Sequence, residues 1–148
     1  EDGLFLCWRV RHGLFEDNLL VANGRYGISI GHKDTDNLIR RNRVNGNRQD
    51  GIYFRDESLG MAAHRNRIEN NLIENNGQTG SVAGITIRGE TRDLILKDNT
   101  IRDTRPKDGR RQTVGIKLGE KAGPVQLDQN AIEAETPVQD KRRGAGSP

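Results

Sequence analysis

The stretch that decides the fold is residues 27–44, GISIGHKDTDNLIRRNRV. Its first phrase, residues 27–30, is a glycine followed by two isoleucines that flank a serine. Its second phrase starts twelve residues later, at Ile39, and has the form apolar-x-x-Asn-x-apolar. Alternation of apolar and polar residues over three or four positions predicts a short β-strand. The asparagine step is typical of a turn between two such strands.

Both phrases recur along the chain. The starts of the glycine phrases are separated by 24, 24, 33 and 31 residues. The glycines that begin them are Gly3, Gly27, Gly51, Gly84 and Gly115. Every period also contains the second phrase, whose asparagines are Asn18, Asn42, Asn71, Asn99 and Asn130. Repeats of this length predict a solenoid of about five coils.

The longer periods indicate loops inserted into a basic coil of 24 residues. The insertions measure five residues between the two phrases of the third coil, and four and seven residues in the turns that follow Asn71 and Asn99. In the third coil Asn66 also fits the second phrase, and choosing it would move that coil's whole insertion to the later turn. We prefer Asn71, because this register keeps the spacing to Asn76 intact. Insertions in solenoids map to loops while the strands stay stacked.

Each coil is expected to contain three short strands that lie parallel to those of the next coil. Helices are nearly excluded, because no window of about 11 residues carries a helical apolar period. The apolar residues would stack inward, and the asparagines would form an internal ladder of side-chain amides. The low hydrophobic fraction of 32% fits this arrangement, since each coil buries only a thin line of side chains.

At this point the sequence resembles the right-handed parallel β-helix proteins of the pectin lyase-like superfamily. The resemblance covers roughly residues 3 to 135 and is carried by Gly51-Ile52-Tyr53-Phe54 and Asn71-Leu72-Ile73-Glu74-Asn75-Asn76. It implies an all-β, single-stranded right-handed parallel β-helix. It does not imply one activity, because the superfamily includes lyases, polygalacturonases, epimerases, tailspikes and members without an assigned function. The chain has no Asp-Pro-His-Asp phrase of the epimerases, no Asn-x-Asp and Asp-Asp pair of the polygalacturonases and no lyase arginine motif.

The resemblance also implies a location for a saccharide groove, on the outer face of the sheet that the glycine-led strands form. Two columns of residues would line this face. They are Phe5, Ser29, Tyr53, Thr86 and Lys117, and Cys7, Gly31, Arg55, Arg88 and Gly119.

Ionisable residues follow the glycine-led strands in three consecutive coils, which stacking would bring about 4.8 Å apart. This cluster contains His32, Lys33, Asp34, Arg55, Asp56, Glu57, Arg88 and Glu90, with Tyr53 beside it. The candidate catalytic residues are His32, Lys33, Asp56, Glu57 and Glu90, and the candidate substrate-binding residues are Tyr53, Arg55 and Arg88.

Three chemistries fit these residues. Two carboxyls among Asp56, Glu57 and Glu90 would serve glycoside hydrolysis, which needs a pair about 5 to 9.5 Å apart. His32 or Lys33 would act as the base in β-elimination from a uronate, with Arg55 or Arg88 binding its carboxylate. A Ca²⁺ ion would be held by Asp34, Asp56 and Glu57, since Ca²⁺ prefers oxygen ligands. No cofactor is required by any of the motifs.

A structural explanation of the same residues remains open, because a β-helix needs a solvated outer face with paired charges. Two functions therefore stand beside each other. One is a carbohydrate-active or glycan-binding domain, either a polysaccharide lyase, a glycoside hydrolase or a binder of acidic polysaccharide. The other is a noncatalytic structural or adhesion β-helix. His12 and His64 stand alone in turns, and we expect both to be solvated rather than metal ligands.

Composition narrows the list of partners. The net charge is only +3, and the basic residues are mixed with acidic ones, so we expect no nucleic-acid partner. No apolar run is long enough to span a membrane. The single cysteine, Cys7, excludes an intrachain disulfide and does not indicate a compartment. An extracellular or periplasmic location would follow only from activity on carbohydrate, and no signal peptide is visible before the first strand.

The two ends of the chain differ from the repeats. Residues 1–6 already have the pattern of a strand, so we expect the first coil to stack on further coils or on another chain. Thr136-Pro137 would end the β-helix domain at residue 135. Residues 136–148 would then form a polar, disordered tail.

Overall fold

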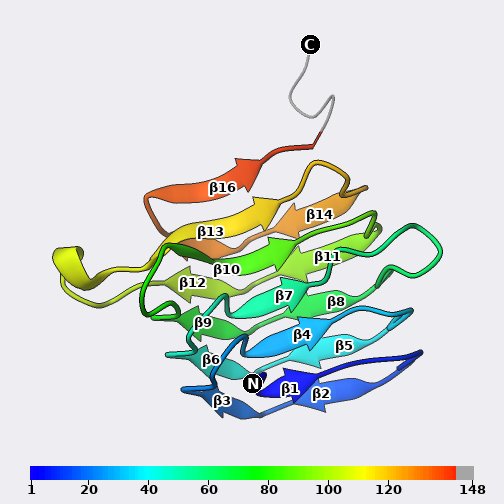
Figure 1. Cartoon of the computed structure of the whole chain (residues 1–148), viewed down its shortest axis with the longest axis horizontal. Coiled ribbons are helices and arrows are strands. Elements are labelled where there is room, and N and C mark those ends of the chain that lie inside the picture. Colours follow the sequence, from blue (N-terminus) through cyan, green and yellow to red (C-terminus); the bar gives the residue numbers. More distant parts are fainter. Residues whose placement is uncertain (143–148) are drawn as a thin grey trace.

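The chain forms a three-sided stack of parallel coils (Figure 1). The computed structural model describes residues 1–142, and their regular structure consists of 16 strands and one short 3₁₀ turn. The strands belong to three parallel sheets of six, five and five strands. Each of the five complete coils contributes one strand to each sheet, and the last strand of the described residues adds a sixth to the first sheet. The predicted parallel β-helix with three strands per coil is therefore confirmed.

The glycine-led strands form the first sheet, as expected. Its strands in spatial order are β1 (Leu4–Phe5), β4 (Ile28–Ile30), β7 (Ile52–Phe54), β10 (Val82–Ile87), β13 (Gln112–Leu118) and β16 (Thr136–Asp140). The register places Phe5 beside Ser29, Ser29 beside Tyr53, and so on through Thr86 to Lys117. The outward column predicted from the sequence is therefore present in the structure.

The strands that flank the asparagine step form the other two sheets. The second sheet contains β2 (Leu14–Glu16), β5 (Leu38–Arg40), β8 (Arg67–Glu69), β11 (Leu94–Lys97) and β14 (Val125–Asp128). The third contains β3 (Leu19–Val21), β6 (Arg43–Asn45), β9 (Leu72–Glu74), β12 (Thr100–Arg102) and β15 (Ala131–Glu133).

Columns of identical or similar apolar residues fill the interior. Ile28, Ile52, Ile85 and Ile116 stack directly on one another from β4 to β13 and are fully buried. A second column from the first sheet, and one from each of the other sheets, complete the core. They are Ile30-Phe54-Ile87-Leu118, Ile39-Ile68-Leu96 and Val44-Ile73-Ile101. One or two inward residues per strand fill the interior, which explains how a chain with few apolar residues keeps a buried core.

The glycines that lead the strands are required by close packing between coils. A Cβ at Gly51 would lie 2.6 Å from Cγ2 of Ile73 and 2.7 Å from the carbonyl oxygen of Gly84 in the next coil. Gly84 meets the same restriction against Ile101 and Gly115. The recurring glycine therefore marks the corner where each coil approaches its neighbour most closely.

Buried asparagines form ladders along the stack. The predicted ladder runs through Asn18, Asn42, Asn71, Asn99 and Asn130 at the turn between the second and third sheets. At each inner rung the amide oxygen accepts from the backbone N–H and the side-chain NH₂ of the coil before it. Asn71 accepts in this way from Asn42 at 3.0 Å and donates to Oδ1 of Asn99 at 3.0 Å. Asn71 is therefore the correct choice for the third coil.

Two further amide ladders were not predicted. Asn23, Asn47, Asn76 and Gln112 are linked at the turn into the first sheet, and Gln112 replaces asparagine after the seven-residue insertion. Asn66, the competing choice for the third coil, has its own rung at the turn before the second sheet. Its Oδ1 accepts from the N–H of Asn37 at 2.9 Å.

The insertions lie in loops, and the strands keep their register apart from one shift between Val82 and Ala83 where β10 pairs with β13. Residues 55–66 join β7 to β8 and form the long loop at the right of Figure 1. Residues 103–111 join β12 to β13, include the 3₁₀ turn η1 (Lys107–Gly109) and project at the left. The position of this second loop was predicted from the sequence. The buried carboxylate that holds the loop in its conformation was not predicted.

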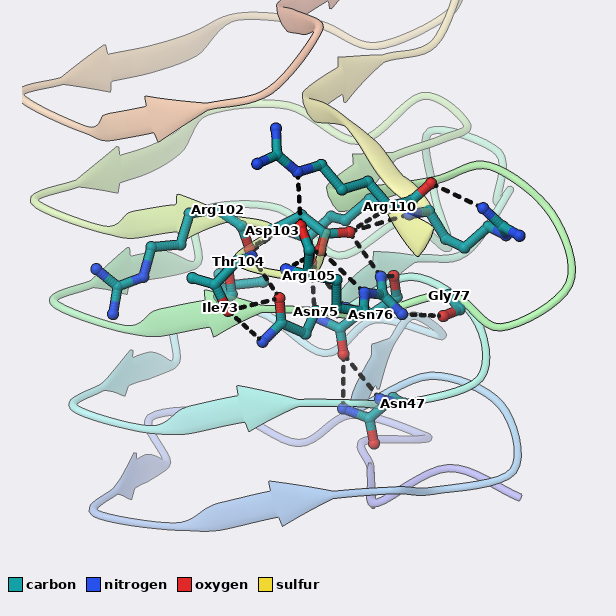
Figure 2. Close-up of polar contacts among 12 residues, drawn as sticks. Asn47, Ile73, Asn75, Asn76, Gly77, Arg102, Asp103, Thr104, Arg105 and Arg110 are labelled. Atoms are coloured by element: carbon teal, nitrogen blue, oxygen red, sulfur yellow. Dashed lines mark hydrogen bonds and ion pairs between the residues drawn. The ribbon is translucent and has the colours of Figure 1, made fainter. Parts of the chain in front are cut away.

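Asp103 organises the projecting loop (Figure 2). Its carboxylate accepts hydrogen bonds from the Arg105 guanidinium at 2.6 Å and 2.9 Å and from the N–H groups of Arg111 and Gln112 at 3.0 Å. Arg105 in turn donates to the carbonyl oxygens of Asn76 and Gly77 in the coil below. Burial alone would raise the pKa of Asp103, but these donors outweigh it and lower the pKa from 3.8 to about 2.

The repeats continue past residue 135, which corrects the predicted start of the tail. Residues 136–140 form β16, which pairs with β13 through Ile116 and Val138 and through Leu118 and Asp140. The edge of β13 offers unpaired backbone groups that a strand can satisfy without many apolar side chains. Val138 is the one apolar residue of β16 that stacks on an inward residue of β13, so the sequence of this strand shows no apolar alternation. The remainder of the expected tail, residues 143–148, lies outside the described residues.

No helix in residues 1–142 is long and apolar enough to cross a membrane.

We predict that Asn71→Leu destabilises the protein by about 3 kcal/mol or more. The change removes the two hydrogen bonds that Asn71 accepts from the N–H and the side-chain NH₂ of Asn42, and the two that it donates to Asn99 and Ile39. The buried N–H of Asn42 loses its acceptor, and an unsatisfied buried group costs about 1–3 kcal/mol. Urea unfolding followed by circular dichroism measures the effect. Asn18→Leu, at the exposed terminal rung, is the matched control and should cost less than about 1 kcal/mol. Equal losses in the two variants would show that the ladder is not what stabilises the stack.

We also predict that Asp103 contributes about 2 kcal/mol to stability above pH 4, because its pKa is lower in the folded chain than in the unfolded one. This contribution is complete above pH 3.8 and disappears as the pH falls toward 2. In Asp103→Asn it should be missing at every pH. Urea unfolding at pH 7, 4 and 2.5 should therefore show a gap between wild type and variant that narrows with acid. A gap that stays constant down to pH 2.5 would contradict the assignment.

Candidate functional site

The outer face of the first sheet is hollowed into a groove of about 550 Å³. It extends along the stack from the second coil to the segment after β16. The residues that line it include Tyr26, Asp50, Tyr53, Thr86, Arg88, Lys117 and Lys141. Tyr53, Thr86 and Lys117 are neighbours in the outward column of the sheet, so parallel pairing itself sets their spacing.

Two stacked tyrosines form one end of the groove. The rings of Tyr26 and Tyr53 lie 4.0 Å apart between centroids and are parallel to within 1°. Arg88 donates a hydrogen bond to the Tyr53 hydroxyl at 3.1 Å and forms an ion pair with Asp56 at 3.2 Å. Burial, together with the neighbouring Tyr53 and Asp50, raises the pKa of Tyr26 to about 12, so its hydroxyl stays protonated at neutral pH.

Asp50 places a carboxylate in the groove. Its Oδ1 accepts a hydrogen bond from the N–H of Ala83 at 2.7 Å. Burial raises the pKa of Asp50, and this effect exceeds the opposing effects of the Ala83 N–H, the Lys117 ammonium and Thr86. The groove therefore combines an aromatic platform, cationic side chains and one carboxyl that protonates more easily than usual.

Sequence reasoning missed Tyr26 and Asp50. Both stand immediately before the glycine of a strand, exactly one coil of 24 residues apart, and Asp2 has the same place one coil earlier. Asp2 also uses its carboxylate as Asp50 does, by accepting from the N–H of Tyr26 at 3.2 Å. Comparison of this position across coils would have indicated that it borders the outer face.

The structure brings several of the predicted site residues together at the turn beside the groove. His32 and Glu57 are in contact, with 3.2 Å between Nε2 and Oε1. Asp56 pairs with Arg88. Glu90 is exposed, and its N–H donates to the carbonyl oxygen of Glu57. Lys33 is half-buried and lies at the same turn, where its N–H donates to the carbonyl oxygen of Met61.

Arg55 points along the sheet toward the first coil rather than into the groove. It donates to Ser29 Oγ at 2.8 Å and to the carbonyl oxygen of Leu6 at 2.7 Å, and its guanidinium lies 4.4 Å from the centre of the Phe5 ring. Gly31 makes this path available, because a Cβ there would lie 2.7 Å from Nε of Arg55. These contacts give Arg55 a bracing role within the sheet.

Asp34 lies beneath the same turn and is fully buried. It accepts from the N–H groups of Val10 and Gly31 and lies 3.6 Å from Arg55. Burial raises the pKa of Asp34 despite these partners. The three carboxylates considered for Ca²⁺ therefore have different partners: Asp34 binds backbone N–H groups, Asp56 pairs with Arg88 and Glu57 contacts His32. Within residues 1–142 no group of three or more His, Cys, Asp and Glu side chains is arranged to hold a metal ion.

His64 also differs from its expected solvated state. Its Nε2 lies 2.6 Å from the carbonyl oxygen of Leu59, and its Nδ1 accepts from the N–H of Arg92 at 3.2 Å. Both contacts brace the third-coil loop.

The comparison with protein-family models matches residues 6–138 to the right-handed β-helix region. The comparisons with curated proteins and with solved structures give no match. The matched range begins in the first coil and ends within β16, so it includes strands of all three sheets, the turn beside the groove and every groove residue named above except Lys141. On this ground the chain belongs to the right-handed β-helix family.

Proposed function

We propose that the groove on the first sheet binds an acidic polysaccharide that lies along the stack. The observation that carries the proposal is the combination of Arg88, Lys117 and Lys141 with a pair of stacked tyrosines in one elongated groove. Cationic side chains attract the carboxylates of uronate residues, and aromatic side chains offer apolar surface and hydroxyls to sugar rings.

The shape of the groove supports a polymer rather than a small ligand. Its lining residues come from successive coils, which repeat every 4.8 Å or so along the stack. A chain of sugars along this axis would meet a new row of side chains at each coil. Arg88 lies in the fourth coil and Lys117 in the fifth, so carboxylates on neighbouring sugars would each find a cation.

The charge balance within the groove favours an anion. Three cationic side chains line it against one carboxyl, Asp50, whose raised pKa reduces its negative charge in mild acid. Asp56 partly neutralises Arg88 from the turn, while the Tyr53 hydroxyl accepts from it. Arg88 is therefore held in place before any ligand arrives, which lowers the entropic cost of binding.

The second candidate function is a noncatalytic scaffold. The contacts of Arg55 favour it, because they stabilise the sheet and do not direct the guanidinium toward a ligand in the groove. Arg55 donates to Ser29 and Leu6 and lies over the Phe5 ring, while its buried Nε has no hydrogen-bond partner among the described residues. The two candidates differ in what Arg55→Ala would do. Under both candidates this change lowers the stability of the fold. It would also lower the affinity of the folded variant for glycan only if Arg55 contacts the glycan directly.

We predict that Lys117→Glu weakens binding to polygalacturonate by about tenfold or more, which corresponds to about 1.4 kcal/mol, because the change replaces an attractive charge by a repulsive one. Tyr53→Ala should weaken it as well. Lys97→Glu, which makes the same charge change on β11 in the second sheet, is the matched control and should have no effect. Isothermal titration calorimetry in low salt measures the affinity of each variant for polygalacturonate. Dextran serves as the neutral glycan for comparison. Absence of binding to polygalacturonate, alginate and hyaluronate would overturn the proposal.

We further predict that affinity for polygalacturonate rises as the pH falls through the raised pKa of Asp50. Protonation removes the one negative charge that lines the groove, whereas the glycan keeps most of its charge until its own carboxylates protonate near pH 3.5. Asp50→Asn should bind at pH 7 as tightly as the wild type does once Asp50 is protonated, and its affinity should change little until the glycan itself protonates. If wild type and Asp50→Asn respond alike to pH, Asp50 is not the titrating group.

A further inference from the structure

Three chemically distinct side chains from successive coils meet at the turn after the first three glycine-led strands. Cys7 of the first coil lies 3.4 Å from His32 of the second, measured from Sγ to Nδ1. His32 lies 3.2 Å from Glu57 of the third, measured from Nε2 to Oε1. The imidazole thus bridges a thiol and a carboxylate through its two different nitrogens. This order of nucleophile, base and orienting group is the arrangement that activates nucleophiles in enzymes.

The backbone holds the imidazole in this position. His32 and Lys33 both have positive φ, 46° and 63°, a conformation that non-glycine residues adopt only when the surroundings enforce it. The enforcing contacts are present: the carbonyl oxygen of His32 accepts from the N–H of Arg9 at 2.9 Å, and buried Asp34 accepts from the N–H of Gly31 at 3.0 Å. The bridge is therefore built into a tight turn.

The alternation of the strand directs Cys7 outward. Leu6, the residue before it, is buried in the core, and Cys7 itself is exposed. Its neighbour in the column is Gly31, which has no side chain to separate the thiol from His32. The thiol is thus open to reagents in solution while one side of it contacts the imidazole.

The partners of the His32 imidazole leave Nδ1 facing the thiol. A carboxylate at Nε2 keeps the proton on that nitrogen, so Nδ1 is free to accept the proton of the thiol and the resulting imidazolium is stabilised. The Arg55 guanidinium binds the carbonyl oxygen of Leu6, next to Cys7, and is partly balanced by Asp34. A base in contact with an exposed thiol activates it as a nucleophile.

We propose that Cys7, His32 and Glu57 form a thiol nucleophile site that reacts with soft carbon electrophiles such as α-halo and α,β-unsaturated carbonyl compounds. Cys7 is the nucleophile, His32 is its base and Glu57 is a positioning residue. With an α-halo amide, the thiol proton passes to Nδ1 of His32, the sulfur electron pair forms a bond to carbon, and the halide leaves with the electrons of the broken carbon–halogen bond. The imidazolium then releases its proton to water.

This site is separate from the groove. Neither Cys7, His32 nor Glu57 lines the groove, and the site requires no glycan. Failure of polysaccharide binding would therefore leave it standing, and an unreactive thiol would leave the groove proposal standing.

The test is the rate of alkylation by iodoacetamide across pH 5 to 9, measured by intact mass. Because Cys7 is the single cysteine of the chain, each added label reports on one residue. At pH 6.5 an ordinary thiol with a pKa near 8.5 is only about 1% thiolate. We expect Cys7 to react about tenfold faster at this pH than N-acetylcysteine. The same protein in guanidinium chloride should lose this advantage.

Variants separate the roles. His32→Gln should lower the rate at pH 6.5 by about tenfold, while Glu57→Gln should lower it less and move the pH profile toward that of an ordinary thiol. Glu57→Asp should restore part of the loss. His12→Gln, which changes a histidine that lies near Asp36 on another turn, is the control and should react like wild type. Circular dichroism verifies folding of each variant.

A rate equal to that of N-acetylcysteine in the folded wild type would overturn the proposal. So would a fast rate that His32→Gln and Glu57→Gln leave unchanged.

Discussion

Each coil of this protein is bound to the next by hydrogen bonds between parallel strands, and this pairing fixes the register of every side chain. The apolar columns, the amide ladders and the outward column of the first sheet are three consequences of the same register. A slip by one residue would turn each inward isoleucine toward water and break every rung. The buried asparagines make such a slip costly, because the bonds between rungs form only when one side-chain amide lies over another.

The parts of the fold that the sequence predicted are those that recur. The glycine and asparagine phrases recur in every coil, so five coils, three strands per coil and the Asn71 register could be obtained by counting. Features that occur in only one coil could not be predicted in this way. Gln112 takes a rung from a different residue type, since its longer side chain reaches the ladder from beyond the insertion. Strand β16 has too few apolar residues to show a pattern, yet it pairs along the open edge of β13.

The candidate site was predicted in position more than in detail. The turn beside the first sheet does gather His32, Glu57, Asp56 and Arg88, because stacking alone brings corresponding residues of neighbouring coils together. Stacking does not determine the direction in which a long side chain extends from its strand. Arg55 turns over Gly31 to the first coil, and Asp34 turns into the protein, because each finds buried partners there. Tyr26 and Asp50 escaped notice since they precede the phrase rather than belong to it.

The amide ladders also bear on how such a chain can change its length during evolution. Each inner rung receives two hydrogen bonds from the coil before it and gives the same two to the coil after it, so all rungs are interchangeable in form. Duplication or loss of one whole 24-residue coil would leave every amide with an equivalent partner and every glycine corner in place. Insertions that fall between rungs are absorbed by loops. The molecule can thus lengthen its outer face by whole coils while its loops diversify independently, which separates growth of the scaffold from change in what the scaffold displays.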